Sequence, residues 1–185
     1  MPRTNKDLIY LYYEYGIDLS SRKIFLYGDI EEEKCKYIAQ SILIMQSNKE
    51  KSIEIYISTH GGDEYEMFGL YDLLKGCPCH VITIGFGKVM SAGVLLLAAG
   101  DERFAYPNTS FMVHESWWED GPERYSQKKA VMGHYKDLYD VWINCMAEST
   151  KFSATKWKQF CEGPDRYFRV EMAKEIGLID KVIRY

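Results

Sequence analysis

The sequence predicts an α/β fold in which strands and helices alternate around a parallel sheet. Three strand-like runs between residues 24 and 85 are each followed by a segment whose apolar residues have helical spacing. Such alternation is typical of parallel strands joined by right-handed crossovers. Each turn from a strand into a helix then lies at the same edge of the sheet, where we expect the site. With 185 residues, the chain is expected to form one domain, residues 1–185.

Periodicity and turn residues predict the elements in chain order. Residues 1–20 fit a strand, a short helix or a mobile N-terminal arm. Beyond them we expect strands at 24–27, 53–57 and 79–85, alternating with helices at 31–46, 65–74 and 92–99. The second half is predicted as an extended segment (103–106), a strand (109–114), a loop (115–121), a long helix (about 121–150), a shorter helix from Ser153, a last helix (170–176) and a closing strand (179–183).

The long predicted helix has a single apolar stripe. Its polar residues are abundant, and the apolar residues that recur at helical spacing are Val131, Tyr135, Leu138, Trp142 and Met146. A long helix that projects from a small domain with such a stripe needs a partner surface, so the stripe predicts self-association.

The composition argues against several classes of protein. A net charge of -4 and the lack of a basic stripe predict no nucleic-acid partner. The longest apolar run, near residues 94–99, is too short to span a membrane, and the N-terminus does not resemble a signal peptide, so we expect a cytoplasmic protein. Five scattered cysteines indicate reduced thiols. Cys77-Pro78-Cys79 lacks a second pair at metal spacing, so we expect neither a metal nor a cofactor in this chain.

Ser91 lies where a predicted strand gives way to an apolar helix that begins at Ala92. One interpretation is a serine that caps the helix. The other is a nucleophile beside the free N–H groups of the first helical turn, which stabilise a developing oxyanion. The spacing differs from the G-x-S-x-G nucleophile elbow, because Val89 occupies the position of the first glycine.

A nucleophilic serine needs a general base, an acid that orients the base, and donors for the oxyanion. His114, at the end of a strand, is the preferred base, and His60 in the glycine-rich turn is its competitor. Asp165, in a loop between two helices, is the candidate acid. Gly61-Gly62 form a turn whose backbone N–H groups can point into the site. The remaining histidines, expected at surface or packing positions, are His80 and His134.

Segments in a fixed order resemble the proteolytic subunit of the Clp protease, ClpP, a family of ATP-dependent serine peptidases. The resemblance covers most of the chain from about Ile24 to the end. The segments that carry it are Ile55–Gly62 followed by Tyr71-Asp72, Gly87–Gly100, Phe104–His114 with Pro107-Asn108 inside it, and Asp165–Asp180. The resemblance implies that Ser91 is the nucleophile, His114 the general base and Asp165 the acid, and that the backbone N–H groups of Gly62 and Ala92 form the oxyanion hole.

The resemblance also implies a fold and an assembly. The fold is of the ClpP/crotonase type, with stacked βαβ units and a projecting helical handle, here residues 121–149. Family members form heptameric rings, two of which stack into a tetradecamer around a chamber, so a homo-oligomer is expected. An unfoldase of the AAA+ class, which uses ATP, feeds unfolded polypeptides into the chamber. Substrate is expected to bind as an added extended strand, with little sequence preference.

The chain departs from the family pattern at several positions. Pro164 stands where the family has an arginine linked to ring pairing, and Glu115–Asp120 replace a glycine-rich loop. The segment at Asp101-Glu102 is short, and residues 1–20 do not resemble the arm that lines the axial pore. Such divergence is compatible with a specialised member, for example a plastid or viral one. The alternative functions are a non-catalytic subunit of a mixed ring and an acyl-CoA enzyme of the crotonase superfamily, which needs no serine nucleophile.

Overall fold

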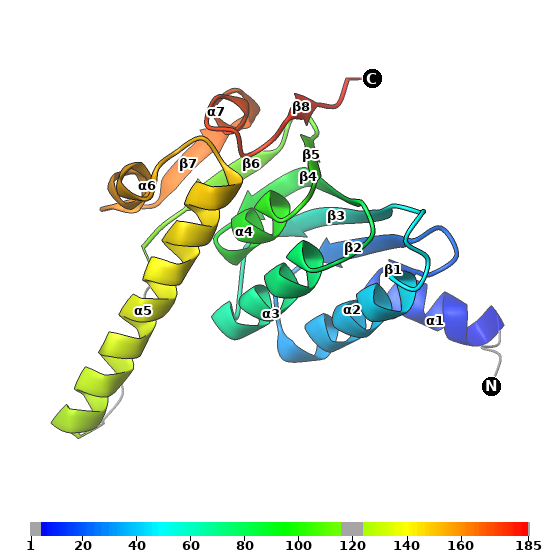
Figure 1. Ribbon diagram of the computed structural model, residues 1–185, viewed down its shortest axis with the longest axis horizontal. Helices are drawn as coiled ribbons and strands as arrows, with labels where there is room; N and C mark the ends of the chain where they lie inside the picture. Colours follow the sequence, from blue (N-terminus) through cyan, green and yellow to red (C-terminus); the bar gives the residue numbers. More distant parts are fainter. Residues whose placement is uncertain (1–4, 116–123, 185) are drawn as a thin grey trace.

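The computed structural model describes residues 5–115 and 124–184. These residues form a mixed α/β fold around a sheet that is mostly parallel, as predicted (Figure 1). The strand order is β1-β2-β3-β4-β5-β8, and β6 pairs with β4 and with β7. The strands are β1 (Ile17–Asp18), β2 (Lys23–Tyr27), β3 (Ile53–Thr59), β4 (Val81–Met90), β5 (Glu102–Ala105), β6 (Ser110–Val113), β7 (Arg166–Arg169) and β8 (Lys181–Val182).

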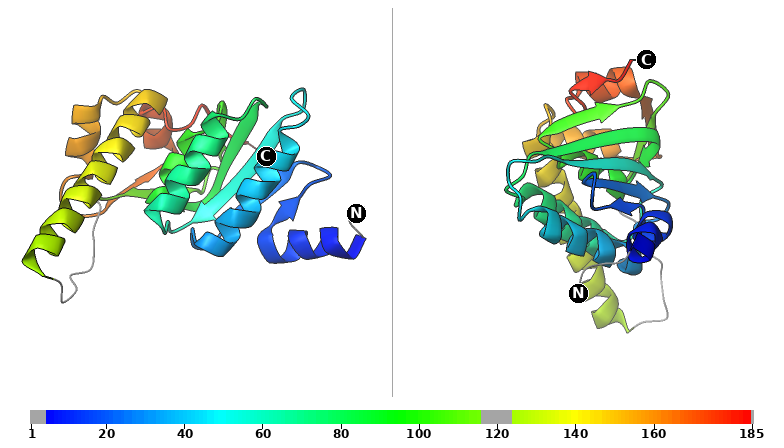
Figure 2. Two further views of the ribbon diagram at one scale, coloured as in Figure 1. Left: turned by 60° about the horizontal axis from the view of Figure 1, so that its bottom comes forward. Right: turned by 90° about the vertical axis from the view of Figure 1, so that its right-hand side faces the viewer.

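The helices divide into a layer on the sheet and a projecting group. Helices α2, α3 and α4 lie side by side on one face of the sheet, and α5 extends away from the body of the molecule (Figures 1 and 2). The helices are α1 (Asn5–Tyr15), α2 (Glu32–Met45), α3 (Glu64–Lys75), α4 (Ala92–Ala98), α5 (Tyr125–Ser149), α6 (Ala154–Cys161) and α7 (Val170–Glu175). No helix of the described residues is long and apolar enough to cross a membrane.

The apolar runs of the sequence account for the core. Helix α4 is buried along its whole length, and Val94, Leu95 and Leu97 are fully inaccessible to solvent. Each such side chain stabilises the fold by about 1.5–3 kcal/mol through burial. Helix α3 begins at a cap, because the Asp63 carboxylate accepts the N–H groups of Tyr65 and Glu66 at 2.8 and 3.0 Å. Helices α3 and α4, which follow the two strand–helix turns, are therefore held in place by the cap and by burial, respectively.

Strand β4 is longer than predicted and pairs with two different strands along its length. The pattern predicted its end at Gly85, whereas the strand continues to Met90. Its first half pairs with β5 and its second half with β6. Gly87, with a φ of 62°, lies where the pairing with β3 shifts, so a glycine that resembles a strand breaker in the sequence instead permits an irregular continuation. The extension carries Ser91 to the side of β6.

Three further parts of the fold differ from the prediction or complete it. Residues 5–15 are helical, which resolves the open prediction for the N-terminus. Arg166–Arg169, predicted as loop, form strand β7 antiparallel to β6. The long helix begins at Tyr125, and the parts of the predicted loop and of the predicted long helix that fall at 116–123 lie outside the described residues. The apolar stripe is partly covered by the chain itself, because Trp142 and Met146 are buried.

Candidate active site

Ser91 occupies the residue between β4 and α4 with an unusual backbone conformation. Its φ is 51° and its ψ is -123°, a sparsely populated region for a residue with a side chain. The conformation is fixed on both sides, since the Ser91 N–H donates to the Met112 carbonyl at 2.8 Å and its carbonyl accepts the Val94 N–H at 2.9 Å. The side chain makes no capping hydrogen bond to the helix. Its hydroxyl is thus left to face the cavity beside it.

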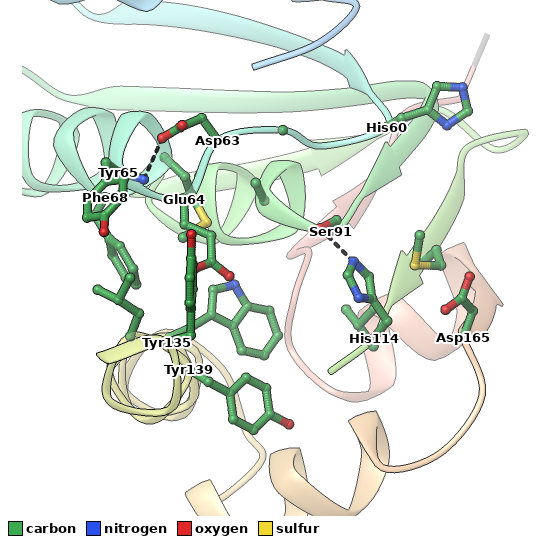
Figure 3. A pocket seen from close by; sticks show the side chains of 17 residues that line it. His60, Asp63, Glu64, Tyr65, Phe68, Ser91, His114, Tyr135, Tyr139 and Asp165 are labelled. Carbon is green, nitrogen blue, oxygen red and sulfur yellow. Dashed lines mark hydrogen bonds between the residues drawn. The ribbon is translucent and has the colours of Figure 1, made fainter. Parts of the chain in front are cut away.

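The Ser91 hydroxyl meets the imidazole of His114. His114 follows β6, which runs parallel to the end of β4, and its Nε2 lies 2.8 Å from Ser91 Oγ (Figure 3). The other ring nitrogen, Nδ1, contacts the carbonyl oxygen of Glu115. A carbonyl only accepts, so Nδ1 carries the proton and a neutral ring leaves Nε2 free to accept from Ser91. This is the tautomer that a general base requires.

Asp165 lies on the other side of the imidazole. Strand β7 pairs with β6 so that Val113 faces Arg166, which places the preceding Asp165 beside the end of β6. Its carboxylate and His114 line one cavity (Figure 3). The carboxylate accepts the Tyr167 hydroxyl at 3.5 Å, and in the described part of the chain no hydrogen bond joins it to His114. The unpredicted strand β7 is therefore what brings the predicted acid into the site.

Gly61 and Gly62 form the neighbouring turn, as the topology predicted. Their φ values of 116° and 147° lie in the region that favours glycine. A Cβ on Gly61 would lie 2.7 Å from Ser91 Cβ, and a Cβ on Gly62 would lie 2.2 Å from the Ile30 carbonyl oxygen. Among the backbone hydrogen bonds of the described chain, none uses the N–H of Gly62 or Ala92. Both donors belong to residues that line the cavity with Ser91.

The Ser91 cavity, as we call it, has a volume of about 530 Å³. One wall comes from α3 and the opposite wall from α5 (Figure 3). Burial raises the pKa of the Tyr139 hydroxyl, which therefore remains a neutral donor. The residues that line the cavity are His60, Gly62, Asp63, Glu64, Tyr65, Met67, Phe68, Ser91, Ala92, Met112, Val113, His114, Tyr135, Leu138, Tyr139, Trp142 and Asp165.

The α3 and α5 walls were not recognised in the sequence as parts of the site. Tyr135, Leu138 and Trp142 belong to the stripe that predicted self-association, and the structure places them in the cavity wall. The apolar pattern of the sequence did not mark Glu64 as a site residue, because it precedes the apolar run of α3. Its position directly after the Gly61-Gly62-Asp63 turn could have indicated the site, since such turns lie at the end of the neighbouring strand.

The other histidines have partners of their own. His60 is exposed at the edge of the cavity and contacts the Lys88 amine rather than Ser91. His80 contacts the Glu102 carboxylate at 3.0 Å, and His134 contacts the Tyr65 hydroxyl at 2.8 Å. Within the described residues, no cluster of three or more histidine, cysteine or acidic side chains is arranged to hold a metal ion.

The fold and the site together define a class of protein: a mostly parallel α/β fold with a serine–histidine pair beside unused backbone donors. The sequence model of the family described as Clp protease matches residues 8–185. ATP-dependent Clp protease proteolytic subunit 2 of Treponema denticola is 29% identical over 171 residues, which cover 90% of this chain and 84% of that protein. The chain therefore belongs to the Clp protease family and is of the peptidase type.

Proposed function

We propose that this chain is a proteolytic subunit of an ATP-dependent Clp protease and that it is a serine endopeptidase. Ser91 is the nucleophile, His114 the general base and Asp165 the acid, with the oxyanion held by the N–H groups of Gly62 and Ala92. The observation that carries the proposal is the 2.8 Å contact between His114 Nε2 and Ser91 Oγ at a strained strand–helix junction. Strain of this kind costs about 1–3 kcal/mol and is concentrated at functional sites.

The geometry supports acyl transfer in two steps. Ser91 Oγ attacks the scissile carbonyl carbon while His114 Nε2 takes its proton, and the carbonyl oxygen becomes an oxyanion between the Gly62 and Ala92 N–H groups. The imidazolium then gives the proton to the leaving amine, which leaves an acyl group on Ser91. Water, deprotonated by His114, attacks the carbonyl carbon of this ester. The bond from that carbon to Ser91 Oγ then breaks, the imidazolium returns the proton to Oγ, and the second product leaves as a carboxylic acid. Two adjacent N–H donors oriented before the reaction supply the main stabilisation of the transition state.

The test is the Ser91→Ala variant. We expect its hydrolysis of short fluorogenic peptides to fall by at least about a thousandfold, because members of a triad act as a unit. A fluorophosphonate probe should label the unmodified protein at Ser91 and leave the variant unlabelled. Ser110→Ala is the matched control, since Ser110 lies in β6 outside the cavity. Equal turnover by the Ser91→Ala variant would refute the proposal.

The expected partners follow from the same proposal. The chain is proposed to form heptameric rings that stack into a tetradecamer in the cytoplasm, and to receive unfolded polypeptides from an AAA+ unfoldase that consumes ATP. Neither alternative function has comparable support. A non-catalytic subunit does not need a serine–histidine pair, and an acyl-CoA enzyme of the crotonase superfamily does not need Ser91.

A further inference from the structure

One side chain of α3 closes the end of the Ser91 cavity that lies away from the serine. Tyr65 lines the cavity, and Figure 3 shows it near Phe68, on the side opposite Ser91 and His114. The Tyr65 side chain is also 55% exposed, so it separates the cavity from solvent rather than from the core. Removal of this ring would therefore open the cavity at its far end.

A contact with α5 holds the Tyr65 ring in this position. The Tyr65 hydroxyl lies 2.8 Å from Nε2 of His134, and the two rings are stacked, with centroids 5.9 Å apart and an angle of 21° between their planes. Because a hydroxyl both donates and accepts, this hydrogen bond is compatible with a neutral and with a protonated imidazole. The hydrogen bond and the stacking restrain the same two side chains. We call this contact between α3 and α5 the Tyr65–His134 bridge.

Both ends of the bridge are attached to residues with fixed positions. On α5, the His134 ring lies against the ring of Tyr135, a cavity-lining residue, with centroids 6.2 Å apart. On α3, the backbone N–H of Tyr65 donates to the Asp63 carboxylate at 2.8 Å. The bridge thus joins two walls that are each held in place, and the cavity between Ser91 and Tyr65 has a definite length.

The walls of the cavity include apolar side chains from both helices. Met67 and Phe68 belong to α3, and Leu138 and Trp142 belong to α5. An aliphatic group that enters such a cavity gains affinity with the apolar area that it removes from water, by about fourfold per methylene group. The gain ends where the chain meets Tyr65, because the ring cannot move aside without loss of its hydrogen bond and its stacking.

We propose that the Tyr65–His134 bridge sets the length of the aliphatic group that the Ser91 cavity accepts. The bridge takes no part in making or breaking bonds, so it is a determinant of specificity and not a catalytic group. The inference rests on the proposed function only in that the aliphatic group belongs to a substrate. The length limit itself is a property of binding and can be tested without cleavage.

The first experiment measures binding without chemistry. Fluorescently labelled peptides that differ only in one linear alkyl side chain, from ~3 to ~10 carbons, are titrated against the full chain carrying Ser91→Ala, with anisotropy as the readout. We expect the affinity to rise by about fourfold per methylene group and then to level off or fall within the series. Affinities that rise throughout the series, or that do not depend on length, would overturn the inference.

Removal of the bridge should move this limit. With Tyr65→Ala added to Ser91→Ala, we expect the affinity to keep rising for about two further methylene groups, a gain of roughly tenfold for the longer peptides. Tyr27→Ala is the matched control, because it removes another exposed tyrosine, from β2 and outside the cavity, and should keep the original limit. An unchanged limit in the Tyr65→Ala protein contradicts the proposal.

Substitutions at His134 separate the bridge from the ring alone. His134→Ala leaves the Tyr65 ring in place but removes its partner, and we expect the limit to move in the same direction by a smaller amount. His134→Gln, whose amide oxygen accepts from the hydroxyl, should restore part of the limit. A limit that shifts with Tyr65→Ala and not with His134→Ala would refute the bridge. If Tyr65→Ala does not fold, as judged by circular dichroism, the two His134 variants decide.

Covalent labelling distinguishes this inference from the proposed function. Fluorophosphonates with the same alkyl series react in the protein with Ser91 intact: Ser91 Oγ bonds to phosphorus, fluoride leaves, and His114 takes the proton. Their labelling rates should show the same length limit and the same shift in the Tyr65→Ala protein. A length limit in binding without any labelling would refute the peptidase proposal and leave the bridge standing. Labelling at rates that do not depend on chain length would do the opposite.

Discussion

At the scale of single residues, the site depends on close contacts around one strained serine. The Ser91 φ of 51° is maintained by backbone hydrogen bonds on both sides and by the absence of a side chain at Gly61. His114 adds a hydrogen bond to the hydroxyl, and its Nδ1 proton is held by the Glu115 carbonyl. Three separate segments thus hold the Ser91 hydroxyl in place. Whether Asp165 orients His114 can be decided by a single substitution.

The prediction for Asp165 separates two ways of orienting His114. If Asp165 accepts the Nδ1 proton during catalysis, Asp165→Asn should lower kcat by about a thousandfold or more and leave KM nearly unchanged, because an amide favours the wrong tautomer. We expect this result. Steady-state kinetics with a fluorogenic peptide measures it, and Glu171→Gln, which removes a charge from the exposed start of α7, is the control. A loss below about tenfold would mean that the Glu115 carbonyl is the orienting group.

At the scale of elements, one arginine joins β5 to the end of α5 and to the approach to β8. Arg103 donates to the Asp180 carboxylate from Nε at 3.2 Å and from Nη2 at 2.7 Å, and it also contacts the Ser149 carbonyl. Partial burial by itself raises the pKa of Asp180. The hydrogen bonds from Arg103 outweigh burial, and the pKa lies below its ordinary value. The base of the projecting helix is therefore tied to the sheet by a charged group.

This ion pair predicts a pH dependence of stability. A carboxyl group whose pKa is lower in the folded state stabilises the fold at pH values above its unfolded pKa, about 3.9, and loses that contribution as the pH falls further. Asp180→Asn should lower the free energy of unfolding at pH 7 by about 1 kcal/mol, since the pair is partly exposed. Calorimetry at pH 7 and pH 3 checks the prediction, with Glu175→Gln on α7 as control. A difference between protein and variant that is as large at pH 3 as at pH 7 contradicts it.

At the scale of the whole molecule, the projecting half of α5 is the part that a lone protomer does not explain. The helix has 25 residues, a length of about 37 Å at 1.5 Å per residue. Its C-terminal half buries Trp142, Ile143 and Met146. Met132 in the projecting half and Val141 on the outer side of the C-terminal half are exposed by 39% and 46%. Exposed apolar side chains on a long unsupported helix favour a contact with another copy.

The corresponding prediction concerns mass. Native mass spectrometry should give assemblies of about seven or fourteen chains, each of 21.6 kDa, as the Clp protease family implies. Replacing both Met132 and Val141 by Asp should shift the distribution toward single chains, because it places charges in the contact. Gln127→Asp, also exposed on α5, is the control. A single-chain mass for the unmodified protein at every concentration would count against the ring.

The sequence predicted the features that depend on local patterns of apolar residues, but not those that depend on long-range pairing of strands. Alternating β-branched runs and helical spacing correctly predicted the order of β2 to α4 and the meeting of the Gly61-Gly62 turn with Ser91. Strand β7 (Arg166–Arg169) was not predicted, because its two aromatic residues are adjacent and flanked by arginines, so it lacks the alternation of apolar and polar residues, and it buries only Phe168 strongly. The pairing of Ser91 with His114 could be proposed from the sequence but its geometry could not, since it depends on a long-range alignment of β4 with β6 that no local pattern encodes.

That alignment limits how the chain can change in length over evolution. Ser91 follows Met90 directly and His114 lies two residues beyond Met112, the partner of Met90 in the neighbouring strand. One residue of strand advances the chain by about 3.3 Å and reverses the direction of its side chain. A deletion inside β6 would therefore turn His114 away from Ser91, whereas the turn at Pro107-Asn108 can grow or shrink without moving either residue. Insertions and deletions among relatives should accordingly collect in such turns and avoid the last residues of these two strands.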